Sequence, residues 1–132
     1  MPQKVLNNDY ATLYFHDDER IIHHVFEKPI GGDAFREILN AGVDLLAETR
    51  ATKWLSDDRN NGIISDEDTQ WVVSDWLIRA RDAGWKSWAL VLPEEILARV
   101  DMSKFVDMVH DLGVHVFLFT DPDEGMEWLR NR

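Results

Sequence analysis

The stretch that decides the fold is KSWALVL, residues 86–92. Both of its faces are apolar, because Trp88 and Leu90 alternate with Ala89 and Val91. A strand with one face in water alternates polar and apolar residues, whereas a central parallel strand is apolar throughout. The stretch therefore predicts a strand in the middle of a parallel sheet, buried on both faces.

Strands and helices alternate along the chain on both sides of this stretch. Apolar residues at three- and four-residue spacing predict the helices, and aromatic or β-branched runs predict the strands. Gly84 and Gly113 each end a helix, and Asp121 with Pro122 begins the last one. The predicted strands are 10–16, 20–26, 52–56, 86–92 and 114–119, and the predicted helices are 33–49, 65–83, 101–112 and one from 121, with a helical turn at 93–95.

The first two strands predict a hairpin around a polar turn at residues 17–20. If residue 16 pairs with residue 21, two faces follow from the alternation of side chains. Right-handed crossovers make the last three strands parallel. We therefore expect an α/β fold with an N-terminal β-hairpin followed by βαβαβα units, built on a mixed five-stranded sheet. One predicted hairpin face holds Leu13, Phe15, Ile22, His24 and Phe26, and the other holds Tyr14, His16, Ile21 and His23.

Length, charge and composition limit the function. The chain has 132 residues, no cysteine and a formal net charge of −11, with a pI near 4.7. Such a length predicts a single domain over residues 1–132. The negative charge argues against nucleic acid as a partner. Residues 1–9 do not read as a leader and no apolar run reaches membrane-spanning length, so we expect a cytoplasmic protein without membrane insertion.

The C-terminal stretch VHVFLFTDPDEGMEWL, residues 114–129, resembles the closing strand and helix of SpoIIAA-like proteins. The strand at residues 88–93 resembles the central strand of that family. The resemblance places the chain in the STAS superfamily, named after sulfate transporters and anti-sigma-factor antagonists. It implies a small β/α fold with an opening hairpin, and regulatory or protein-binding work without catalysis.

Ser65 lies roughly where the resemblance implies the phosphorylated serine of the anti-sigma-factor antagonists. Here it is followed by Asp66, Glu67 and Asp68, which would repel a phosphate group. The same four residues form a variant of the capping box, in which Ser65 accepts a backbone N–H and Asp68 reaches back. The residues therefore favour a helix cap over a phosphorylation site.

The same loop has the spacing of a calcium-binding EF-hand loop. Two residues oppose that interpretation: Arg59 puts a cation where a ligand oxygen belongs, and Asp68 is shorter than the usual glutamate. A polar connector with an Asn-Gly turn is the alternative. The residues that match the calcium pattern are Asp57, Asn61, Gly62, Ile64, Ser65 and Asp68.

His16 and His23 share a predicted hairpin face near Tyr14, so the two imidazoles could hold a metal ion. Asp17 or Asp18 could add an oxygen ligand. No third imidazole joins them, because His24 is predicted to point to the opposite face. We therefore expect no bound metal and no cofactor.

The candidate binding residues are Asp57, Asp58, Arg59, Ser65 and Trp71. The first three follow a strand at the sheet edge where open α/β folds often hold ligands. Trp71 lies off the apolar stripe of its helix, which leaves two interpretations open: an exposed contact for a partner, or packing at the edge of the core.

Three functions remain. The first is a non-catalytic regulatory domain that binds a protein partner or a second copy of itself, as a homodimer, through residues 57–76. The second is a small-molecule or lipid carrier with a pocket between sheet and helices, which needs an apolar cavity. The third is a metal-dependent enzyme using His16 and His23. Because the chain has 6 tryptophans, we expect a filled interior, which argues against the carrier.

Overall fold

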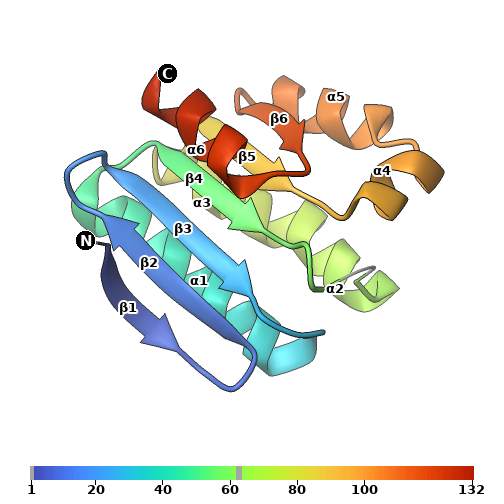
Figure 1. Ribbon diagram of the computed structural model, residues 1–132, viewed down its shortest axis with the longest axis horizontal. Coiled ribbons are helices and arrows are strands. Elements are labelled where there is room, and N and C mark those ends of the chain that lie inside the picture. Colours follow the sequence, from blue (N-terminus) through green and yellow to red (C-terminus); the bar gives the residue numbers. More distant parts are fainter. Residues whose placement is uncertain (1, 62–63) are drawn as a thin grey trace.

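A six-stranded sheet forms the centre of the computed structural model, which describes residues 2–61 and 64–132 (Figure 1). The strands lie side by side in the order in which the chain makes them. β1, β2 and β3 pair antiparallel, and β3 to β6 pair parallel. The strands are β1 (Gln3–Asn7), β2 (Ala11–His16), β3 (Ile21–Phe26), β4 (Lys53–Asp57), β5 (Ser87–Val91) and β6 (His115–Phe119).

The predicted α/β class and mixed sheet are confirmed, and the last three strands are parallel as expected. The hairpin register is also confirmed, since His16 pairs with Ile21 and Leu13 pairs with His24. The predicted strand count was wrong, because β1 adds a sixth strand at the edge. β1 is mostly exposed and has no alternation of apolar and polar residues, so the sequence pattern does not mark it as a strand.

The helices occupy the positions that the apolar spacing predicts. The predicted helix at 65–83 is one continuous rod made of α2, a π-helical turn η1, and α3. No helix in the described part of the chain is both long and apolar enough to cross a bilayer. The helical elements are α1 (Gly32–Thr49), α2 (Asp66–Trp71), η1 (Val72–Trp76), α3 (Leu77–Asp82), α4 (Glu94–Arg99), α5 (Ser103–Asp111) and α6 (Pro122–Arg130).

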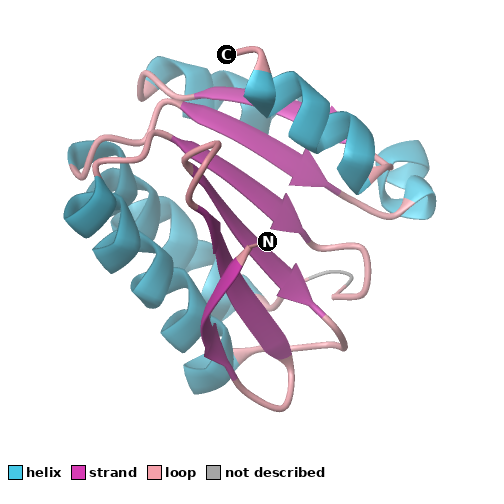
Figure 2. Cartoon of the chain, turned by 60° about the vertical axis from the view of Figure 1, so that its left-hand side comes forward, coloured by secondary structure: helices cyan, strands magenta, loops and turns pink. Residues whose placement is uncertain are grey.

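Helices cover both faces of the sheet (Figure 2). On one face α1 packs against β2 and β3, the α2–η1–α3 rod packs beside it, and α5 packs against β6. On the other face α6 packs against β4 and β5. The α6 side therefore has one helix, and the part of that face on β2 and β3 carries Tyr14, His16 and His23, which are only partly buried.

Four tryptophan rings form the centre of the larger core. Neighbouring rings of Trp54, Trp76, Trp85 and Trp88 have centroids 4.6–6.2 Å apart. Each of the four indole N–H groups also donates a hydrogen bond, so none is a buried donor without a partner. This cluster joins β4 and β5 to the α2–η1–α3 rod.

β6 is only partly buried, unlike the central strand β5. It is the edge strand of the sheet, and the side chain of Phe117 is 56% exposed. Phe117, Phe119 and Trp128 form an aromatic group on the α6 side, with ring centroids 5.4–5.9 Å apart. α6 packs mainly over β4 and β5, so the side chain of Phe117 at the sheet edge stays largely exposed although most residues of this strand are apolar.

Candidate functional site

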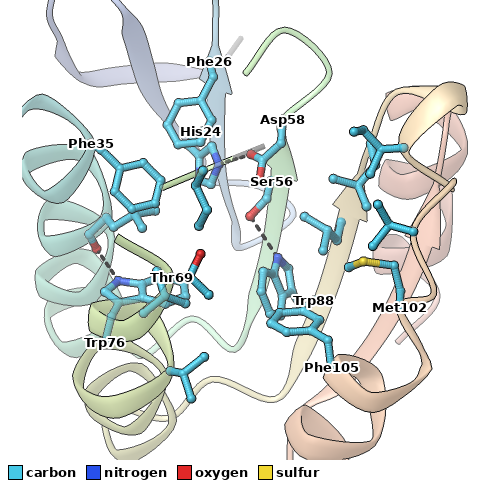
Figure 3. Close-up of a pocket in the computed structure, with 18 of the residues that line it drawn as sticks. His24, Phe26, Phe35, Ser56, Asp58, Thr69, Trp76, Trp88, Met102 and Phe105 are labelled. Atoms are coloured by element: carbon cyan, nitrogen blue, oxygen red, sulfur yellow. Dashed lines mark hydrogen bonds and ion pairs between the residues drawn. The ribbon is translucent and has the colours of Figure 1, made fainter. Parts of the chain in front are cut away.

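An apolar pocket of about 470 Å³ opens between the sheet and its helices at the carboxyl ends of β3, β4 and β5 (Figure 3). α1 and the α2–η1 segment form one wall, and the α4–α5 segment forms the opposite wall. Small-molecule sites in proteins commonly fall between about 300 and 1,000 Å³. The volume is therefore in the range that one drug-sized or lipid-sized molecule requires.

The pocket walls are almost wholly apolar. Phe35 and Leu39 contribute from α1, and Val72 and Trp76 contribute from η1. Phe105 contributes from α5, where its ring packs edge-on against Trp88 at 5.7 Å between centroids. A ligand on such a surface is buried from water but finds few hydrogen-bond partners. Its binding free energy would therefore come from the hydrophobic effect.

The expectation of a filled interior was wrong. The four central tryptophans pack against one another, so their bulk fills the part of the core beneath β4 and β5. Only two of these rings, those of Trp76 and Trp88, reach the pocket wall. The six tryptophans therefore indicate that the core beneath β4 and β5 is densely packed. They do not indicate whether a pocket opens beside it.

The π-helical turn η1 lies in the pocket wall. The N–H of Leu77 donates to the carbonyl of Val72, five residues earlier, instead of four as in an α-helix. A π-helical turn inserts one extra residue into a helix, and such turns are frequent at functional sites. Here the insertion places Val72, Val73 and Trp76 together on the pocket side.

One corner of the pocket is polar. Nε2 of His24 lies 2.7 Å from Oδ1 of Asp58, and the indole N–H of Trp54 donates to Nδ1 of His24 at 3.1 Å. An indole nitrogen can only donate, so Nδ1 accepts and the ring proton belongs on Nε2, where it is donated to Asp58. Both ring nitrogens are therefore engaged within the protein.

Ser56 lies beside this pair on the same face of β4. Its Oγ accepts the indole N–H of Trp88 at 2.8 Å. Within residues 2–61 and 64–132, the hydroxyl hydrogen of Ser56 has no acceptor. Ser56 and Asp58 both line the pocket, so the polar corner offers one hydroxyl and one carboxylate to the apolar cavity.

The structure divides the predicted trio Asp57, Asp58 and Arg59 between two faces. Side chains alternate along a strand, so Trp54, Ser56 and Asp58 face the α1 side of the sheet, where the pocket opens, while Asp57 faces the α6 side. Asp57 binds Arg59 through two hydrogen bonds of 2.9 Å, and these raise the pKa of the guanidinium. Of the trio, only Asp58 lines the pocket, so the structure does not bring the three side chains together at this cavity.

Ser65 caps α2, as the sequence predicts. Its Oγ accepts the backbone N–H of Asp68 at 3.1 Å. The reverse half of the capping box was wrong, because the Asp68 side chain turns to α1 instead. There Oδ2 accepts the N–H of Gly32 at 3.0 Å, and Oδ1 lies 3.6 Å from Nε of Arg36. Asp68 is buried and ties the start of α2 to the start of α1.

The first and last carboxylates of the calcium pattern are engaged within the protein. Asp57 binds Arg59, and Asp68 binds the start of α1. Asn61 uses its Oδ1 to accept the N–H of Ile30 at 2.8 Å. Gly62 lies outside the described residues. Within the described ranges no group of three or more His, Cys, Asp or Glu side chains is placed to hold a metal ion.

His16 and His23 do lie together, with Nε2 of His16 3.0 Å from Nδ1 of His23. Burial, and to a lesser extent the neighbouring imidazoles of His16 and His24, lower the pKa of His23 to about 4. Burial also lowers the pKa of His16. The pair therefore stays uncharged at neutral pH, and one ring donates to the other.

Trp71 packs at the edge of the core, and its contact with a partner stays a prediction. One edge of its ring packs on Phe35, at 6.3 Å between centroids. The ring also meets two cations, since the guanidinium carbons of Arg36 and Arg79 lie 5.0 and 5.8 Å from its centroid. The side chain is partly buried and does not line the pocket.

Sequence reasoning missed His24 and Ser56 as site residues. Period-two alternation from Trp54 would have placed Ser56 and Asp58 on one face, and the correct hairpin register placed His24 on the core side. The parallel pairing of His24 with Ser56 brings these signals together. That pairing joins residues far apart in the chain, so no local sequence pattern predicts it.

Comparison of the chain with protein-family models, with curated proteins and with solved structures finds no significant match.

Proposed function

We propose that this protein is a non-catalytic binding domain that holds an apolar small molecule in the pocket between its sheet and its helices. The observation that carries the proposal is the cavity of about 470 Å³ with almost wholly apolar walls. This is the carrier function that the sequence analysis placed second, and it moves to first place because a cavity of the required kind exists.

The chemistry of the polar corner supports binding over catalysis. In a Ser-His-Asp triad the histidine offers one nitrogen to the nucleophile and gives the other to the carboxylate. Here the nitrogen that would face a nucleophile accepts the indole N–H of Trp54 instead. His24 therefore holds Asp58 in position without offering a free base to a substrate.

Binding of N-phenyl-1-naphthylamine, a neutral fluorescent probe of apolar sites, tests the proposal. We expect saturable one-to-one enhancement of the probe emission. Val73→Phe adds a ring to the η1 wall and Ile96→Phe adds one to the α4 wall, so each should weaken binding by about tenfold or more. The matched control is Ile78→Phe, which adds the same ring to an exposed position of the same rod and should bind like the unchanged protein.

Two results contradict the carrier function. One is a probe signal that does not saturate or is absent. The other is equal binding by both wall variants and the control, once thermal unfolding has shown that all of them fold.

The protein-binding function stays as a second proposal, together with the SpoIIAA-like assignment on which it depends. Two surface features favour it: the exposed edge strand β6 with Phe117, and Trp71 with its two arginines. Light scattering after size exclusion tests self-association. A dimer that Phe117→Ser or Trp71→Ala converts to monomer supports this proposal, whereas a monomer at all concentrations removes the homodimer from it.

A further inference from the structure

We propose that the pocket selects molecules whose apolar body ends in a cationic, hydrogen-bond-donating group such as a primary ammonium, and that Asp58 is the residue that receives this group. The inference rests on the proposed function and specifies its ligand. It follows from the number of donors and acceptors in the polar corner.

The hydrogen bonds of the corner run in one direction. Trp54 donates to His24, and His24 donates to Asp58. Because the first donor is an indole, which has no acceptor, the order cannot be reversed. The chain of donors ends on a carboxylate, so the corner presents an acceptor and a negative charge to the cavity.

Asp58 has acceptor capacity left. A carboxylate offers about four lone-pair sites on its two oxygens. Among the residues that the structure describes, His24 is the one donor to this side chain, and the side chain is 23% exposed. An ammonium group at the second oxygen would form a charge-assisted hydrogen bond, which is roughly twice as strong as a neutral one.

The nearest basic residue in the chain does not compete for this oxygen. Arg59 follows Asp58 directly, but its guanidinium is bound to both oxygens of Asp57 on the opposite face of the sheet. Asp58 therefore keeps its charge available on the pocket side.

The remaining charged residues of the pocket lie at its mouth. Asp101 and Lys104 are exposed, just before and within the first turn of α5. Lys104 would favour an anionic head group only at this outer position, where solvent weakens the interaction. The formal net charge of −11 further raises the local concentration of cations over anions.

Three decyl compounds with identical tails test the selection: decylamine, decanol and decanoate, each competing with N-phenyl-1-naphthylamine at neutral pH below its micellar concentration. We expect decylamine to bind about tenfold more tightly than decanoate, with decanol between them. Because an alkyl ammonium is charged at neutral pH, as the lysine side chain is, the comparison isolates the head group.

Asp58→Asn is the decisive variant. An asparagine oxygen can still accept from His24, so the corner keeps its hydrogen bonds while losing the charge. We expect this variant, once thermal unfolding has shown that it folds, to lose the preference for decylamine over decanol and decanoate. The matched control is Asp101→Asn, which removes a carboxylate from the pocket mouth and should keep the preference.

The outcomes separate this inference from the proposed function. If the probe binds but decanoate competes as well as decylamine, or if Asp58→Asn keeps the preference, the selection by Asp58 is wrong and the carrier function stands. If the unchanged protein does not bind the probe, the carrier function itself is wrong.

Discussion

Gly42 of α1 faces the indole ring of Trp54 so closely that a Cβ on Gly42 would lie 2.0 Å from Cη2 of that ring. No real side-chain atom tolerates such a distance, and the ring is held between Trp76, Trp85 and the hydrogen bond to His24. The absence of a side chain at Gly42 is therefore what lets α1 approach the sheet at this point.

Gly42→Ala should destabilise the protein by about 1–3 kcal/mol, because the added methyl group overpacks the core. The sign of this change in the free energy of unfolding is informative, because a glycine-to-alanine change inside an unobstructed helix stabilises a protein by up to about 1 kcal/mol. Urea unfolding measures the effect. Asp44→Ala, at an exposed position of α1, is the control and should change the free energy of unfolding by less than about 0.5 kcal/mol. A stabilised Gly42→Ala protein would show that α1 and β4 are farther apart.

The buried His23 predicts a loss of stability in weak acid. Its pKa is about 4 in the folded protein and near 6.5 in the unfolded chain, so between these values the unfolded chain binds more protons. The contribution of His23 to the free energy of unfolding is fully present above pH 6.5 and is lost as the pH falls toward 4. The expected loss is about 2 kcal/mol between pH 7.5 and pH 5.

His23→Gln removes the titrating group and should flatten this part of the pH profile, measured by urea unfolding at both pH values. His110→Gln is the control, because His110 is exposed on α5 and should leave the profile unchanged. Equal pH dependence in the unchanged protein and in His23→Gln would contradict the assignment to His23.

Asp68→Ala should lower the free energy of unfolding by about 1–3 kcal/mol, because it leaves the Gly32 N–H and the Arg36 side chain without their partner. Glu67→Ala, the exposed neighbour in the same helical turn, should cost much less. Because Asp68 also fixes the start of α2 beside the pocket, we expect Asp68→Ala to weaken binding of N-phenyl-1-naphthylamine as well. Unchanged stability would mean that α1 and α2 are held together by their apolar contacts alone.

Trp88 and Trp128 should respond differently to a ligand in the pocket. Trp88 lines the wall, whereas Trp128 lies on α6 at the opposite face of the sheet. A bromoalkane quenches indole emission on contact, so 1-bromooctane should quench the protein's emission less in Trp88→Phe than in Trp128→Phe. Equal quenching in the two variants would place the bromoalkane outside the pocket.

The sequence predicted the elements whose patterns are local. The stripe of Phe35, Ile38, Leu39 and Leu46 marked the buried face of α1, and all four are buried. The two faces of the hairpin followed from alternation on the condition that His16 pairs with Ile21, and the structure has this pairing. β1 had no such signal, because an exposed edge strand needs no apolar alternation to pair through its backbone.

The pocket could not be predicted from composition, because a cavity depends on how side chains from distant elements fit together. Trp76 and Trp88 are large, yet they pack mainly against other tryptophans and leave space toward Phe105 and Phe35. Asp58 was identified as a candidate from its place after a strand, but its partner His24 lies 34 residues earlier in the chain. Only the parallel pairing of β3 with β4 brings them together.

The π-helical turn η1 makes the rod behind the sheet sensitive to chain length. This turn holds one residue more than an α-helical turn, so deleting one residue from η1 would give a regular α-helix with α2 and α3 still in line. Val72, Val73 and Trp76 would then no longer all share the pocket side, while Leu77 and Ala80 would keep their places in the core. A single-codon deletion here would thus reshape what the protein binds and leave most of its interior intact.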